Sequence, residues 1–145
     1  MKQEFDLEEF LPYLLNQAAE ATSRSFEQIY SAKYNMTRTQ WRVLANLGKF
    51  GDMTAKDICK ISHIEKTKVS RAIVALEESG FLVRQVSADD RRVENLSLST
   101  NGRRIFSELG KRALDYDRQL RIRLGAEVSE KLTKVLKAMA SQAAD

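Results

Sequence analysis

The sequence predicts a mainly α-helical fold with one small β-hairpin, and three observations support this. The 145 residues contain a single proline and many alanine, leucine, lysine, glutamate and arginine residues, which favour helix. Apolar residues recur at helical spacing, and capping residues separate one stretch from the next. The pattern changes once, at residues 81–98, where two strand-like runs surround a polar, charged turn.

The first helix is predicted at residues 11–33. Thr37 and Gln40 then form a capping box, because a hydroxyl and an amide three residues apart can satisfy each other's backbone donors at a helix start. Gly48 and Gly51 are predicted to end this second helix.

A short third helix is predicted from Thr54, with Asp57 three residues later, through Ile61. A tight break at residues 62–64 separates it from a fourth helix at residues 65–79. Two short helices with a tight turn, followed by a hairpin, form a winged helix-turn-helix.

The hairpin strands are predicted at residues 81–86 and 93–98. Ser99 or Thr100 then caps a long helix, and Ser129 is predicted to cap the last one.

The fourth helix divides into two faces when its residues are placed 100° apart. The residues predicted to pack inward are Val69, Ala72, Ile73 and Leu76. The residues predicted on the outer face and its edges are Lys66, Thr67, Lys68, Ser70, Arg71 and Val74. Hydroxyls and cations of this kind can donate to base edges and phosphates, so this face is the predicted DNA-reading surface.

The hairpin tip carries Asp89, Asp90, Arg91 and Arg92. An acid can pair with one arginine and hold the loop while the other arginine extends into a narrow minor groove. The residues alone leave open which arginine pairs with Asp90.

The charge distribution agrees with an anionic partner in the middle of the chain. The formal net charge is +4, and residues 36–104 alone carry a net charge of +5.

Residues 53–104 resemble the MarR (multiple antibiotic resistance regulator) family. The resemblance rests on the run from Glu65 to Ala72, on Asp90-Arg91-Arg92, and on the run from Leu96 to Arg103. Ser87 departs from the family pattern, which often has an aspartate at this position.

The resemblance implies one domain over residues 1–145, with a DNA-binding lobe at about 36–100 and dimerisation helices at about 5–34 and 101–143. It implies a cytoplasmic homodimer that binds a pseudo-palindromic operator as a repressor, and it favours Arg92 as the wing residue that reaches DNA. It also implies a small effector such as an aromatic acid, with candidate contacts at Tyr13, Phe26, Tyr30, Trp41 and Arg42.

Two alternatives remain beside this interpretation. Cys59 could make the chain a thiol-based redox sensor, although a lone small cysteine in a short helix more often packs inertly. The chain could also be a helical interaction module that does not bind DNA. No cofactor is expected, no metal site is expected around the single histidine, His63, and no enzyme motif is present.

Overall fold

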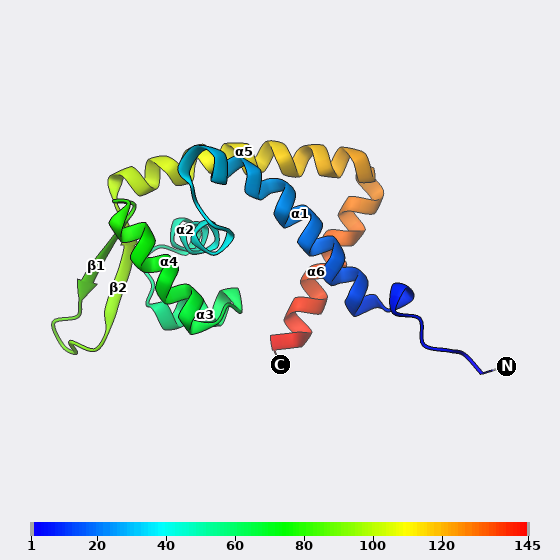
Figure 1. Cartoon of the computed structure of the whole chain (residues 1–145), viewed down its shortest axis with the longest axis horizontal. Coiled ribbons are helices and arrows are strands. Elements are labelled where there is room, and N and C mark those ends of the chain that lie inside the picture. Colours follow the sequence, from blue (N-terminus) through cyan, green and yellow to red (C-terminus); the bar gives the residue numbers. More distant parts are fainter. Residues whose placement is uncertain (1, 145) are drawn as a thin grey trace. The chain divides into compact units, whose positions relative to one another are not determined.

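The computed structural model describes residues 2–144, which form helices and one hairpin (Figure 1). The elements in chain order are η1 (Leu7–Glu9), α1 (Leu11–Tyr34), α2 (Arg38–Phe50), α3 (Ala55–Ser62), α4 (Lys66–Glu78), β1 (Leu82–Val86), β2 (Glu94–Leu98), α5 (Thr100–Leu124) and α6 (Ala126–Ala144). The chain divides into two compact units, with the boundary inside α5 between Leu109 and Gly110. The predicted fold class, mainly α with a small hairpin, is confirmed.

The core of the first unit lies where α2, α3, α4 and the hairpin meet. The largest fully buried side chains are Tyr30, Leu44, Ile58, Leu76, Leu96, Ile105, Leu109, Val43 and Val69. These side chains come from α1, α2, α3, α4, β2 and α5, so one apolar cluster fixes the helix-turn-helix and the base of the hairpin together.

The capping box predicted at Thr37 is present, and the helix start predicted at Thr54 is also a capping box. The backbone N–H of Gln40 donates to Thr37 Oγ1 at 3.2 Å. In return, Gln40 Oε1 accepts from the backbone N–H of Thr37 at 3.4 Å. Thr54 and Asp57 make the equivalent pair at the start of α3, with both distances 3.1 Å. The backbone hydrogen bond from Thr54 lowers the pKa of Asp57. Both helix starts were therefore predicted correctly.

The prediction that α2 ends at Gly48 is wrong, because the helix continues to Phe50. A Cβ built on Gly48 would lie 2.6 Å from the ring of Phe106, so this glycine permits close packing of α2 against α5. Gly51 does end the helix, with a φ of 81° that glycine adopts without strain.

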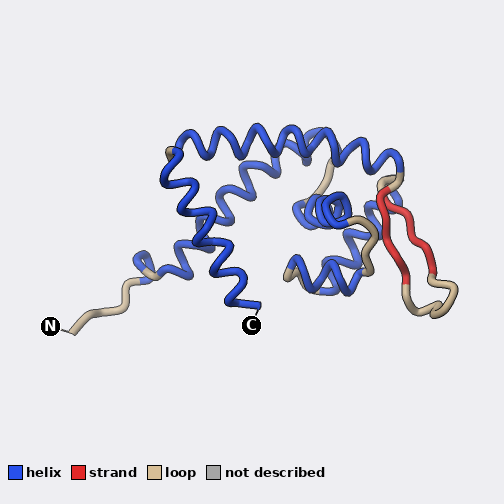
Figure 2. The backbone as a smooth tube through the Cα atoms, turned by 180° about the vertical axis from the view of Figure 1, so that it is seen from behind, coloured by secondary structure: helices blue, strands red, loops and turns tan. Residues whose placement is uncertain are grey.

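The hairpin is antiparallel and pairs Leu82 with Leu98 at its base and Val86 with Glu94 at its outer end (Figure 2). Leu82, Leu96 and Leu98 are buried, which anchors the base of the hairpin in the core. Met53 pairs with Leu96 through two backbone hydrogen bonds of 3.0 and 2.8 Å, which the sequence pattern did not predict.

The second unit contains the rest of α5 and all of α6. The prediction that Ser129 caps the last helix is wrong, because α6 begins three residues earlier at Ala126. Gly125, with a φ of 90°, separates the two helices, and the Ser129 hydroxyl donates to the Ala126 carbonyl at 3.1 Å inside the first turn. Within residues 2–144, no helix is both long and apolar enough to cross a membrane.

Candidate nucleic-acid interface

The turn between α3 and α4 is short because one residue reverses the chain. His63 adopts a left-handed backbone with a φ of 58°, and its N–H donates to the Cys59 carbonyl at 3.0 Å. Ile64 packs against the core, and Glu65 is the N-cap residue before α4. This tight turn presents α4 as the outer helix of the pair (Figure 1).

The two predicted faces of α4 are confirmed in their burial. Val69, Ala72, Ile73 and Leu76 are all at most 3% exposed. The exposed residues of α4 include all six that were predicted on the outer face and its edges, namely Lys66, Thr67, Lys68, Ser70, Arg71 and Val74. The helix therefore presents hydroxyls, cations and one apolar side chain outward from a fixed core.

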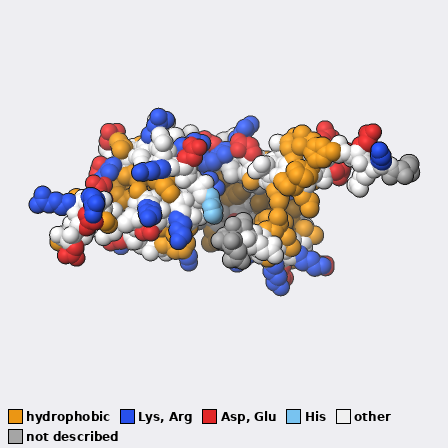
Figure 3. Space-filling view, turned by 90° about the horizontal axis from the view of Figure 1, so that it is seen from below, with side chains coloured by type: hydrophobic (Ala, Val, Ile, Leu, Met, Phe, Trp, Pro, Cys, Tyr) orange, Lys and Arg blue, Asp and Glu red, His pale blue; other side chains and the backbone are white. Residues whose placement is uncertain are grey.

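The cations of α4 are unneutralised within the described part of the chain. Lys66, Lys68 and Arg71 make no ion pair with any residue in 2–144, although Glu65 is adjacent in sequence. Figure 3 shows lysine and arginine side chains, interspersed with acids, over the part of the molecule that carries α4 and the hairpin. Unpaired cations on an exposed helix are available to phosphates and base edges.

The wing tip is a short turn held by Ser87 and Asp90. The Ser87 hydroxyl accepts from the backbone N–H groups of Asp89 and Asp90 at 3.3 and 3.4 Å. This serine, at the position where an aspartate would match the family pattern, therefore stabilises the turn through the backbone and not through an ion pair.

Asp90 pairs with Arg92, which answers the question that the residues alone left open. Arg92 donates to Asp90 through its backbone N–H at 3.0 Å and its Nε at 3.1 Å. The side-chain hydrogen bond from Arg92 lowers the pKa of Asp90. A turn that brings the backbone of Arg92 onto Asp90 also brings its guanidinium there, whereas Arg91 makes no ion pair with a described residue. The Arg92 side chain nevertheless stays 91% exposed.

The five predicted effector contacts do not come together as one set. Phe26, Tyr30 and Trp41 pack on one another, with ring centroids 5.4 to 5.8 Å apart. Tyr30 is 1% exposed and belongs to the core. Tyr13 lies 13 residues before Phe26 on the same helix, which separates them by about 20 Å along its axis. Tyr13 is therefore not part of this cluster.

Arg42 lines a cavity of about 570 Å³ beside the helix-turn-helix turn. The same cavity is lined by Arg38 from α2 and by His63 and Lys68 from the turn and α4, with Glu27 on the α1 side. Glu65 also lines this cavity, so its charged lining is mixed. Arg38 is paired with Glu20 and Glu27, whereas Arg42 and Lys68 make no ion pair with a described residue.

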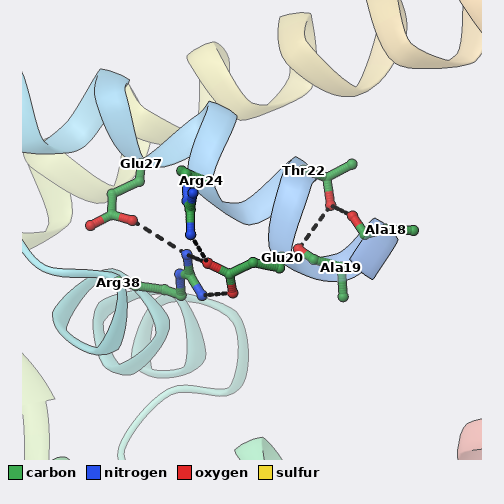
Figure 4. Close-up of polar contacts among 7 residues, drawn as sticks. All are labelled: Ala18, Ala19, Glu20, Thr22, Arg24, Glu27 and Arg38. Carbon is green, nitrogen blue, oxygen red and sulfur yellow. Dashed lines mark hydrogen bonds and ion pairs between the residues drawn. The ribbon is translucent and has the colours of Figure 1, made fainter. Parts of the chain in front are cut away.

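Arg38 is a functional candidate that sequence reasoning missed, and it joins α2 to α1 (Figure 4). Its guanidinium donates to Glu20 at 2.8 and 3.2 Å and to Glu27 at 3.4 Å. The hydrogen bonds from Arg38, and then from Arg24, lower the pKa of Glu20 to about 2, and the same contact with Glu20 raises the pKa of Arg38. The partners are 18 and 11 residues apart, so helical periodicity contains no signal for them.

Cys59 lies in α3, four residues before His63 in the turn. Cys59 is half-buried and packs against the core. Among residues 2–144, no group of three His, Cys, Asp or Glu side chains is arranged to hold a metal ion.

Known proteins share this architecture. A sequence model of the MarR family matches residues 34–93, which include α2 to α4, β1 and the wing turn. The chain is 29% identical over 96 residues to the HTH-type transcriptional regulator FarR of Neisseria gonorrhoeae, a match that spans 66% of this chain and 65% of FarR. It is 25% identical over 126 residues to the homoprotocatechuate degradative operon repressor of Escherichia coli, covering 87% of this chain and 84% of the repressor.

A solved structure shares the fold over nearly the full chain. The structure of Bordetella bronchiseptica BpsR, described as explaining the regulation of its DNA binding by 6-hydroxynicotinic acid, matches with a TM-score of 0.83. The sequence identity is 22%, and the match covers 95% of this chain and 98% of BpsR.

The structure is a winged helix-turn-helix fold whose helix α4 presents a cationic outer face. Over residues 34–93 the chain is similar to the MarR family, and the named relatives are transcriptional regulators. These matches agree with the predicted resemblance.

Proposed function

We propose that this protein is a MarR family member and a homodimeric repressor that binds a pseudo-palindromic DNA operator and is released by a small aromatic acid. In this proposal residues 36–100 form the DNA-binding lobe, and residues 5–34 and 101–143 form the dimerisation helices. Helix α4 enters the major groove through Lys66, Thr67, Lys68, Ser70 and Arg71. The wing reaches the minor groove through Arg91 and Arg92, with Asp90 holding the turn.

The observation that carries DNA binding is the division of α4 into a buried apolar face and an exposed cationic one. The exposed side chains are anchored by buried neighbours on the same helix, so they are presented in a fixed arrangement. Fixed donors discriminate base edges better than mobile ones, because less conformational entropy is lost on binding.

The exposed apolar side chains near the two ends of the chain support the homodimer. The exposed members of the N-terminal group are Phe5, Leu7, Phe10, Leu11 and Leu14. Those of the C-terminal group are Leu124, Val128, Leu132, Val135, Leu136 and Met139. Apolar groups of this extent mark protein–protein surfaces, and a second copy of the chain would cover both.

The aromatic acid is supported by two relatives and by the cavity beside the turn. One relative is named as the repressor of a homoprotocatechuate degradative operon, and the BpsR structure concerns regulation of DNA binding by 6-hydroxynicotinic acid. Arg42 is the predicted effector contact that lines the cavity, so we assign it to the carboxylate of the effector.

The test is a binding titration on labelled DNA from upstream of the protein's own gene, with a scrambled duplex as the control. We expect tight binding to the upstream DNA and a footprint with two half-sites about 10 base pairs apart, on one face of the duplex. Equal affinity for both duplexes, or a footprint over one half-site alone, would contradict the proposal.

The effector is tested by repeating the titration with 6-hydroxynicotinate and a panel of hydroxylated benzoates and phenylacetates. The matching amides serve as controls, because they keep the ring and remove the charge that Arg42 would bind. At least one acid should weaken DNA binding while its amide does not, and Arg42→Gln should remove that difference. Release by acids and amides alike would exclude a carboxylate site at Arg42.

A further inference from the structure

Arg84 of β1 joins the recognition helix to both strands of the wing. Its Nε donates to Glu77 of α4 at 3.1 Å, and its Nη1 donates to Glu94 of β2 at 3.0 Å. The Arg84 side chain is 30% exposed, and the two glutamates are 43% and 42% exposed. Three separate elements therefore meet at one guanidinium.

Apolar side chains leave a space between α4 and the hairpin next to Arg84. The base of the hairpin is buried through Leu82, Leu96 and Leu98, but Val83 and Val86 on the outer part of β1 are exposed. A cavity of about 250 Å³ lies between α4 and the hairpin. Buried Ile73 and Leu96 line it on the core side, and Ser70, Val74, Arg84 and Glu94 line it on the outer side. Across this space the ion pairs of Arg84 connect the wing to α4.

Beyond Arg84 the wing is held by its own hydrogen bonds. Ser87 and Val93 close the hairpin with a backbone bond of 2.9 Å, and the tip carries Asp90 and its arginines. Arg84 is therefore the outermost side chain that ties the hairpin to the recognition helix by an ion pair within residues 2–144.

We propose that Arg84 is a positioning residue, whose two ion pairs set the angle between α4 and the wing so that both reach DNA together. The proposal rests on the proposed function, in which α4 and the wing enter adjacent grooves. One guanidinium shared by two carboxylates has a net charge of −1, so the cluster as a whole does not attract phosphates.

The rival role for Arg84 is direct contact with DNA. The two roles predict opposite changes in DNA affinity when Glu77 is removed. If Arg84 bound phosphate, Glu77→Ala would free it and would also remove a negative charge, so DNA binding would tighten. If Arg84 positions the wing, Glu77→Ala breaks the tie to α4 and weakens binding. Glu78→Ala is the matched control, because Glu78 is the adjacent exposed glutamate and makes no ion pair with a described residue.

We expect Glu77→Ala and Arg84→Met each to weaken operator binding by about three- to tenfold, while Glu78→Ala leaves it unchanged or tighter. Arg84→Lys, which keeps the charge but not the planar fork, should recover part of the loss. Tighter binding by Glu77→Ala would overturn the proposal.

A double-mutant cycle with Arg92→Ala tests whether Arg84 acts through the wing tip. In the Arg84→Met background, Arg92→Ala should reduce DNA affinity much less than it does in the wild type. The reason is that the wing tip is no longer positioned in the minor groove. If the loss of affinity in the double variant equals the product of the two single losses to within about twofold, the two residues act independently, and the proposal would be overturned.

A DNA-free measurement keeps this proposal separate from the proposed function. Spin labels at Lys66→Cys on α4 and Asp89→Cys on the wing tip, in a Cys59→Ser background, report the distance between the two elements. Labelled chains are diluted in a large excess of unlabelled chains so that distances within one chain are recorded. Arg84→Met should broaden the distance distribution and Glu78→Ala should not. An unchanged distribution would overturn the proposal even if the protein binds DNA, whereas a broadened one would support it even if the operator is misassigned.

Discussion

Helices α4 and α6 are both amphipathic, but their apolar faces have different surroundings. In α4 the apolar face is buried, and Ile73 and Leu76 are at most 2% exposed. In α6 the corresponding side chains Leu132, Val135 and Leu136 remain 40 to 53% exposed. A helix whose apolar face is already covered can use its polar face to bind another molecule. A helix whose apolar face is uncovered gains most by binding through that face.

This comparison links each helix to a different role. The outer face of α4 carries cations without ion-pair partners among residues 2–144, whereas Lys131 and Lys134 of α6 pair with glutamates one turn away. The cations of α4 are thus left for a ligand, whereas two of the three lysines of α6 are paired within the helix. DNA binding is accordingly proposed for α4 and dimerisation for α6.

The largest effect is expected on the free energy of unfolding, when a residue on the buried face of α4 is replaced. Ile73→Ala should lower the free energy of unfolding by about 2–5 kcal/mol, because it leaves a cavity in the core. Val74→Ala, at the adjacent exposed position, should change it by no more than about 0.5 kcal/mol. Urea unfolding at a fixed protein concentration measures both, and similar losses would show that α4 does not pack as described.

The next effect is on association, in α6. The double variant Leu132→Glu, Leu136→Glu should raise the dimer dissociation constant by about 100-fold or more, since it places charges on the exposed apolar face. Sedimentation equilibrium measures this constant, and circular dichroism checks that helicity is kept. Lys134→Glu with Lys137→Glu is the control on the polar positions. If the control dissociates the dimer and the apolar variant does not, the assignment of this face is refuted.

A smaller effect is expected from the ion pairs between α1 and α2 in acid. The pKa of Glu20 is lowered from 4.5 to about 2, chiefly by Arg38, so its contribution to stability is present above pH 4.5 and is lost as the pH falls through 2. The difference in Tm between the wild type and Glu20→Gln should therefore be constant above pH 4.5 and shrink between pH 4.5 and 2. Glu9→Gln is the control, and a difference that persists unchanged at pH 2 would contradict the role of Glu20.

The smallest effect is expected at Cys59. Because the thiol is half-buried and packs against the core, Cys59→Ser should leave DNA affinity and effector release nearly unchanged. The comparison is made with and without peroxide. Release of the wild type by peroxide, together with resistance of the variant, would establish a redox role and refute the packing interpretation.

Most of the fold could be predicted because its signals are local. The capping boxes at Thr37 and Thr54 join residues three apart, and the inward face of α4 repeats at helical spacing. The helix end at Gly48 was mispredicted because glycine there serves close packing against Phe106, a contact between residues 58 positions apart. The start of α6 was mispredicted because Gly125 alone breaks the helix, without a side-chain cap at Ser129.

The candidate site was predicted in its exposed residues but not in its connections. Arg38 with Glu20, and Arg84 with Glu77 and Glu94, are ion pairs between separate elements, and their partners cannot be read from spacing within one element. The aromatic residues of the predicted effector site could be recognised by type. Their packing into one cluster, with Tyr30 in the core, depends on how α1 meets α2.

The most direct test of the central claim compares Arg71→Ala with Arg92→Ala on operator and random DNA across a salt series. Arg71→Ala should cost about 1–3 kcal/mol on the operator and less on random DNA, because a base contact is lost. Arg92→Ala should weaken binding to both duplexes alike and lower the salt slope by about one, because a wing contact in the minor groove or at phosphate is lost. Equal, salt-independent losses for the two variants, or no loss for either, would contradict the assignment of base reading to α4 and backbone or minor-groove binding to the wing.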